Sequence, residues 1–187
     1  MNLTTKEFIA EIFYSGPHGF RGDMQVAEKI SFLVNEGYLV MRKVTIGTKS
    51  DYMNVASDTS LINSRNEAAG GSREHIALKL LAQLYCEREY TSVCVFEQSF
   101  AGFFPDIISI DKHTLCECGH TNNAEKILTY FRHPTVQRVI QVPYPDETDD
   151  LLYGYIFKAE STLVPFLDFE AKDIALSIKA ILNRKRQ

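Results

Sequence analysis

The sequence predicts an α/β protein whose mixed central β-sheet is flanked by helices, with a small, mainly helical N-terminal segment. One observation is a helical pattern that begins at the N-cap residue Ser72 and continues through residues 73–89. Another is a series of short apolar runs of strand character separated by turn residues. From Ser72 the expected order is helix, three strands, helix, two strands and a final helix. The expected strands are 93–100, 103–111, 114–119, 136–145 and 153–160, and the later helices are 124–133 and 168–185.

The N-terminal residues 1–46 are expected to form a separate, mainly helical part of the chain. Helical patterns cover 4–15 and about 24–35, and a strand-like run follows. The stretch LVNEGYLVMRKV resembles the end of a recognition helix entering the wing of a winged-helix domain. Residues 47–71 are polar and bounded by glycines, which is typical of a linker or mobile loop. The α/β core is therefore expected to span 72–187.

The composition limits the classes of protein to which this chain can belong. The chain has 187 residues, of which 45% are hydrophobic, so it can bury a core of ordinary size. It contains no apolar run long enough to span a membrane and no N-terminal signal pattern, so we expect a cytoplasmic protein. The formal net charge of −4 excludes a surface coated in basic side chains. A local basic groove for nucleic acid remains compatible with that charge.

Two acids stand out on adjacent expected strands. Alternation along 103–111 places Asp106 on one face, and alternation along 114–119 places Glu117 opposite in direction to Cys116 and Cys118. A turn at 112–113 would join the strands into a hairpin and bring the two carboxylates together among aliphatic neighbours. Two buried carboxylates repel each other unless a cation lies between them. Mg²⁺, which prefers one or two carboxylates with water and phosphate, would remove that conflict.

A third acid, Glu74, lies in the first turn of the helix that begins after Ser72. At 100° per residue it falls about 60° from the centre of the expected buried stripe. His75, Lys79 and Gln83 fall away from that stripe. Glu74 therefore either contributes to the acidic site or favours the positive end of the helix. The stripe itself consists of Ala77, Leu78, Leu80, Leu81, Leu84 and Tyr85.

This order of residues resembles the PD-(D/E)XK nucleases: an acid on a helix, Pro-Asp opening a strand, a Glu on the next strand, then a helix. The resemblance covers 72–145 and implies a restriction-endonuclease-like core. It implies that Asp106, Glu117 and the backbone carbonyl of Cys118 bind Mg²⁺ or Mn²⁺, and that Glu74 is the helical acid. The expected function is metal-dependent hydrolysis of phosphodiester bonds in nucleic acid, DNA rather than RNA. A homodimer is compatible with such a function.

The chain departs from this pattern at one position. The lysine that the resemblance implies two residues after Glu117, where it would activate water and stabilise developing charge, is Gly119. Lys126, in the first turns of the following helix, is one candidate replacement, and His120 is another. Glu97, on the preceding strand, is a candidate additional acid. Without a replacement lysine, the alternative is a catalytically inactive nuclease-like module that binds nucleic acid or assembles with proteins.

The cysteines raise a second alternative. All four lie in apolar patterns, where free thiols behave as small hydrophobic groups, and a disulfide framework is not expected. Two of them, Cys116 and Cys118, lie between His113 and His120, and these four residues have the ligand types that zinc prefers. Strand alternation, however, would direct both thiols into a core rather than toward a metal. Ordinary surface acids on a one-sided sheet are the remaining interpretation of Asp106 and Glu117.

Overall fold

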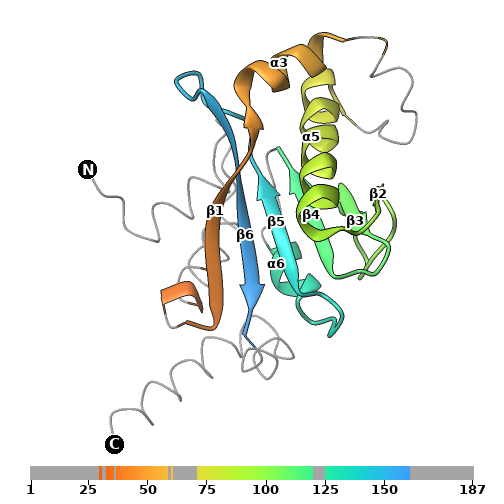
Figure 1. Ribbon diagram of the computed structural model, residues 1–187. Coiled ribbons are helices and arrows are strands. Elements are labelled where there is room, and N and C mark those ends of the chain that lie inside the picture. Colours follow the sequence, from red (N-terminus) through yellow and green to blue (C-terminus); the bar gives the residue numbers. More distant parts are fainter. Residues whose placement is uncertain are drawn as a thin grey trace, which may run out of the picture.

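The computed structural model describes Ile30 and residues 33–35, 37–58, 60, 71–119 and 125–160. Six strands form one sheet in the order β1-β6-β5-β4-β3-β2 (Figure 1). Neighbouring strands are antiparallel except β4 and β5, which are parallel and are connected through α6. The α/β class and the mixed sheet are therefore confirmed. The strands are β1 Leu39–Thr48, β2 Cys94–Phe96, β3 Ile107–Ser109, β4 Thr114–Cys118, β5 Arg138–Val142 and β6 Leu151–Ala159, and the helices are α3 Lys49–Ser57, α5 Arg73–Tyr90 and α6 Glu125–Tyr130.

The second and third strands are shorter than expected. Glu97 and Ala101 both adopt positive φ angles, of 51° and 54°, which extended strands do not accommodate. As a result β2 ends at Phe96, and the chain makes a small loop before β3 begins at Ile107. Asp106 therefore immediately precedes the strand in which we expected it.

The described end of the expected N-terminal part, from residue 39 onward, belongs to the sheet. Strand β1 pairs with β6 from Leu39↔Ala159 to Thr48↔Leu151, so the expected boundary at residue 46 falls inside one strand. The expected linker likewise begins with the end of β1 and helix α3, which Thr48 and Asp51 cap reciprocally. Sequence patterns missed this arrangement because the partner strand lies about a hundred residues away, and non-local pairing leaves no local signal. The expected helices 4–15 and 168–185 lie outside the described residues.

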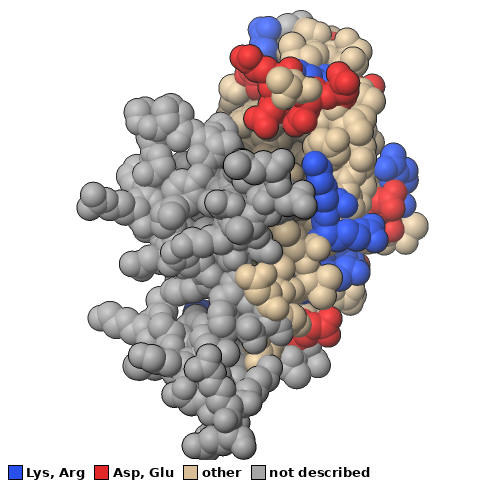
Figure 2. All heavy atoms as spheres, turned by 90° about the vertical axis from the view of Figure 1, so that its left-hand side faces the viewer, with Lys and Arg blue, Asp and Glu red and all other residues tan. Residues whose placement is uncertain are grey.

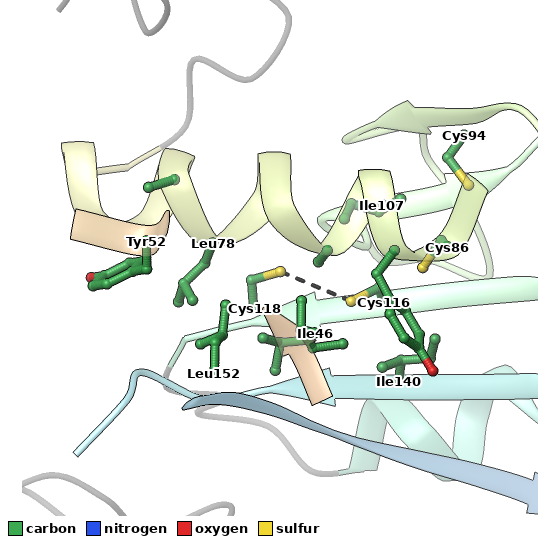
Figure 3. Packing of buried hydrophobic residues seen from close by; sticks show 14 of the residues in the cluster. Ile46, Tyr52, Leu78, Cys86, Cys94, Ile107, Cys116, Cys118, Ile140 and Leu152 are labelled. Atoms are coloured by element: carbon green, nitrogen blue, oxygen red, sulfur yellow. Dashed lines mark hydrogen bonds between the residues drawn. The ribbon is translucent and has the colours of Figure 1, made fainter. Parts of the chain in front are cut away.

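The sheet carries a hydrophobic core on each face. On one face, Leu115 and Val139 pack with α6 residues such as Ile127, and with Ile30, Leu33 and Leu39 from the N-terminal part. On the other face, α5 lies across the sheet, and Figure 3 shows its Leu78 and Cys86 facing Cys116, Cys118 and Ile140. The opposite directions of Leu115 and Cys116 confirm the alternation expected for β4.

Helix α5 is rotated relative to the sequence expectation. Lys79, expected away from the buried stripe, is fully buried, whereas Leu84, expected within it, is 60% exposed. Ala77, Leu78, Leu80 and Tyr85 are buried as expected. The expectation was wrong at Lys79 and Leu84 because apolar residues occur in nearly every direction around this helix, so periodicity does not select one face. Hydrogen bonds and ion pairs from α5 to β2 and to the residues beside it explain the rotation of this helix. His75 contacts Asp106, Lys79 contacts Glu97, Gln83 donates to the Cys94 carbonyl, and Glu87 accepts from the Cys94 N–H.

We expect Glu97→Gln to lower the free energy of unfolding by about 2 kcal/mol. The Glu97 carboxylate lies 2.5 Å from the buried Lys79 ammonium, which would lose this ionic partner. Urea denaturation measures the change. Glu89→Gln is the matched control, because it removes only an exposed contact with Arg88 and should change stability by less than about 0.5 kcal/mol. Equal stability of both variants and wild type would show that the Lys79–Glu97 pair does not stabilise the fold.

Charge is unevenly distributed on the described surface. The loop between β5 and β6 carries the exposed acids Asp146, Glu147 and Asp150, while β1 exposes Arg42 and Lys43. In the view of Figure 2, Asp and Glu atoms gather at the upper end of the molecule, and Lys and Arg atoms group below them. The net negative charge therefore coexists with a local basic area. None of the described helices is both long and apolar enough to cross a membrane.

Candidate functional site

Asp106 lies where the loop after β2 enters β3, and both of its carboxylate oxygens are engaged. Oδ1 lies 3.1 Å from Nε2 of His75 on α5, and Oδ2 accepts a 2.7 Å hydrogen bond from the backbone N–H of Cys118 on β4. The preceding Pro105 is buried, which helps to hold the entry to the strand. Asp106 is therefore held between α5 and the neighbouring strand, with a side chain that is 15% exposed.

Glu117 is the most deeply buried acid of the site. It is 4% exposed in the middle of the sheet, on the face covered by α6. Its Oε1 accepts a 2.6 Å hydrogen bond from the Tyr130 hydroxyl, and its Oε2 lies 3.1 Å from Nζ of Lys126. Burial raises the pKa of Glu117, and the nearby Lys126 charge and Tyr130 hydroxyl oppose that rise. A buried carboxylate with this environment favours a cation beside it.

The two acids lie near each other at the open end of the β3–β4 hairpin. The recorded pairing of Ile108 with Leu115 and of Ile107 with Cys116 ends one residue before Asp106 and Glu117. The negative charge of Asp106 is also among the causes that raise the pKa of Glu117. The structure thus brings the two acids near each other, but their side chains contact different helices. Asp106 contacts His75 on α5, whereas Glu117 contacts Tyr130 and Lys126 on α6.

The carbonyl group of Cys118 also faces this pair. The next N–H, that of Gly119, donates a 2.7 Å bond to Val142 on β5. In a trans peptide the C=O and the following N–H point in opposite directions, so the Cys118 carbonyl points away from β5 and toward the Asp106 side. The Cys118 carbonyl and the Asp106 carboxylate therefore lie on the same side of the end of β4.

No protein-family model matches this chain. Searches of curated proteins and of solved structures likewise find no match.

Lys126 is the candidate cation that the structure places at the site. It lies in the first turn of α6, and the salt bridge from Nζ to Glu117 joins that helix to β4. The Phe103 ring lies 5.9 Å from Nζ and packs edge-on against Tyr130, with ring centroids 6.0 Å apart. The Lys126 side chain is 24% exposed, so its ammonium borders solvent while it contacts a buried acid.

Glu74 does not lie at the inner edge of α5, where we expected it. It is exposed, and hydrogen bonding with Ser72 lowers its pKa. The rotation of α5 explains the difference, because the neighbouring His75 takes the inward direction and contacts Asp106 instead. The Glu97 carboxylate forms a salt bridge with the Lys79 ammonium. His120 lies outside the described residues, and its role stays a prediction, as does a role of Glu74 in catalysis.

The zinc interpretation does not fit the described geometry. Cys116 and Cys118 are free, buried thiols in the core beneath α5, with sulfur atoms 3.9 Å apart, and His113 instead lies 3.4 Å from Asp111. Within the described part of the chain, no three His, Cys, Asp or Glu side chains form a group that could hold a metal. Strand alternation directs both thiols into the core, and this is why they do not form a zinc site with the histidines.

Three side chains make contacts at the site that the sequence patterns did not predict. His75 contacts Asp106, Tyr130 donates to Glu117, and the Tyr144 hydroxyl lies 3.5 Å from Nδ1 of His75. The sequence patterns place Tyr130 in the helix expected at 124–133 and Tyr144 in the strand expected at 136–145, and they assign neither residue to the site. A Lys and a Tyr four residues apart lie on the same side of a helix, which is a signal that could have linked Tyr130 to Lys126.

Proposed function

We propose that this protein is a metal-dependent nuclease that hydrolyses phosphodiester bonds. The observation that carries the proposal is the buried Glu117, whose pKa the nearby Asp106 charge helps to raise, with the Lys126 ammonium 3.1 Å from the Glu117 carboxylate. The order α5, β2, β3, β4 and α6 also agrees with the order of helix and strands on which the resemblance to PD-(D/E)XK nucleases is based. Lys126 then takes the role of the lysine that Gly119 cannot supply.

The residues present fit a Mg²⁺ or Mn²⁺ ion. Asp106 and Glu117 offer hard oxygen ligands, and an ionised carboxylate has about four acceptor sites, so the hydrogen bonds already made leave capacity for a cation. The Cys118 carbonyl faces the same place. Mg²⁺ commonly uses only one or two protein carboxylates and completes its shell with water and phosphate. A site with two acidic side chains therefore matches this ion better than a closed protein cage would.

A bound divalent ion would neutralise charge on the phosphodiester and make a neighbouring water more acidic. The chain's own residues then have separable tasks. Asp106 and Glu117 hold the ion, while Tyr130 fixes the orientation of the Glu117 carboxylate. The Lys126 ammonium, which is partly exposed, can donate to a phosphate oxygen as negative charge develops there.

The charge distribution supports a nucleic acid as the substrate. Arg42 and Lys43 are exposed on β1, and Figure 2 shows Lys and Arg atoms grouped below a group of Asp and Glu atoms. Such an area attracts a phosphate backbone although the whole chain is acidic. DNA is the expected substrate from the resemblance, with RNA as the comparison.

The test is cleavage of end-labelled single- and double-stranded DNA and RNA with Mg²⁺, with Mn²⁺ and with EDTA. We expect cleavage of DNA with either metal and none with EDTA. The double variant Asp106→Ala/Glu117→Ala, purified in the same way, shows whether a contaminating nuclease is responsible. Wild type that cleaves none of the four substrates with either metal would contradict the proposal. Binding without cleavage in a gel-shift assay would then favour the inactive nucleic-acid-binding module.

A further inference from the structure

Tyr144 occupies the space that a side chain at position 119 would require. Gly119 has a φ of +74°, in the left-handed region, and a Cβ built on it would lie 2.8 Å from Cε2 of Tyr144. Any other residue here would meet both backbone strain and the aromatic ring. The lysine that the resemblance implies at this position would therefore require Tyr144 to move and would place a strained backbone at residue 119.

The Tyr144 hydroxyl continues into a chain of polar contacts that ends at the site. It lies 3.5 Å from Nδ1 of His75, whose Nε2 lies 3.1 Å from Oδ1 of Asp106. The other Asp106 oxygen accepts from the Cys118 N–H. Both oxygens of this carboxylate are thus fixed, one by the backbone of β4 and one through α5.

The donor and acceptor roles in this chain are mutually consistent. An ionised carboxylate only accepts hydrogen bonds, so Nε2 of His75 carries the hydrogen that points to Asp106. In a neutral imidazole Nδ1 is then the acceptor, and the Tyr144 O–H is the donor to it. Ser72, the N-cap of α5, accepts from the His75 N–H and holds the start of the helix against this chain of contacts.

We propose that His75 and Tyr144 are positioning residues, which hold the Asp106 carboxylate in the orientation that a divalent ion requires. This inference rests on the proposed function. Residues that hydrogen-bond to metal ligands fix ligand orientation, and their removal typically weakens metal binding by 10- to 100-fold. Tyr144 thus fills the room left by the glycine and also acts on the metal site through His75.

The experiment measures Mn²⁺ binding to the protein alone by isothermal titration calorimetry. The variants are His75→Ala, His75→Gln and Tyr144→Phe, with Tyr153→Phe on β6 as the matched tyrosine control. We expect the dissociation constant to rise about 10- to 100-fold in His75→Ala and about 3- to 10-fold in Tyr144→Phe. His75→Gln, whose amide can donate to Asp106, should recover part of the loss. Tyr153→Phe should bind as wild type does.

Two further measurements separate positioning from a general loss of structure. Melting temperatures in EDTA should agree among wild type, Tyr144→Phe and His75→Gln to within a few degrees. The double variant His75→Ala/Tyr144→Phe should bind no more weakly than His75→Ala, because the tyrosine acts through the histidine. In cleavage assays, the half-saturating Mn²⁺ concentration should rise more than the maximal rate falls.

The outcomes distinguish this inference from the function on which it rests. Wild type that neither binds Mn²⁺ nor cleaves nucleic acid overturns the proposed function. Wild type that binds Mn²⁺ and cleaves, with His75→Ala and Tyr144→Phe binding equally tightly, overturns the positioning role alone. Additive losses in the double variant would overturn the coupling between Tyr144 and His75.

Discussion

Glu117→Gln is expected to lower metal-dependent cleavage by at least about 1,000-fold, because a neutral amide is a poor ligand for Mg²⁺ and the metal contributes several kcal/mol to catalysis. The fold should persist. The amide has the same shape, can still accept from Tyr130, and relieves the burial of a charge that raises the pKa of Glu117. The loss of the Lys126 contact opposes that relief, so we expect stability to change by no more than about 1 kcal/mol.

Single-turnover cleavage and urea denaturation of the same preparation test both halves of this prediction. Glu147→Gln on the exposed β5–β6 loop is the matched control, and its cleavage rate should equal that of wild type. Cleavage by Glu117→Gln within tenfold of the wild-type rate would remove Glu117 from the metal site. A large loss of stability in the variant would instead assign Glu117 a mainly structural role.

Lys126→Met is expected to lower the cleavage rate by about 100- to 1,000-fold, the range seen when one preorganised donor to developing charge is removed. Metal binding should be preserved or tightened, because the ammonium that shares the Glu117 carboxylate is gone. This pattern separates the chemical step from metal affinity, in contrast with Glu117→Gln, which should lose both. Methionine keeps most of the aliphatic length of lysine and its packing near Phe103.

Lys158→Met on β6 is the control for removal of one exposed positive charge, and it should cleave at close to the wild-type rate. Cleavage rates at saturating Mn²⁺ and calorimetric Mn²⁺ affinities are the two measurements. Full activity of Lys126→Met, together with loss of activity in His120→Ala, would transfer the role of the lysine to His120. Full activity of both variants would exclude both replacements.

The hairpin that carries the two acids was predictable because its determinants are local. Side chains alternate along any strand, so Glu117 had to point away from Cys116 and Cys118, and the short turn between the strands brought Asp106 near it. The start of α5 was equally local, since Ser72 caps it. Lys126 was expected in the first turns of the helix that follows β4, and its contact with Glu117 agrees with that position.

Other features depend on segments that are distant along the chain. The rotation of α5 follows from partners on β2 and near β3, so Lys79 is buried and Glu74 exposed, contrary to the helical pattern. The pairing of β1 with β6 joins residues about a hundred positions apart, and it incorporates a strand that we had assigned to a separate segment. No local periodicity carries information about such partners.

The class of fold, the direction of Glu117 away from Cys116 and Cys118, and the hairpin that brings Asp106 near Glu117 follow from the amino-acid sequence alone. Backbone sterics and strand alternation act within a few residues, so local patterns predict these features. In contrast, the contact of His75 rather than Glu74 with Asp106, and the position of Tyr144 beside Gly119, follow only from the tertiary structure. Both depend on how α5 and the end of β5 pack around β4, and packing is a property of the assembled sheet.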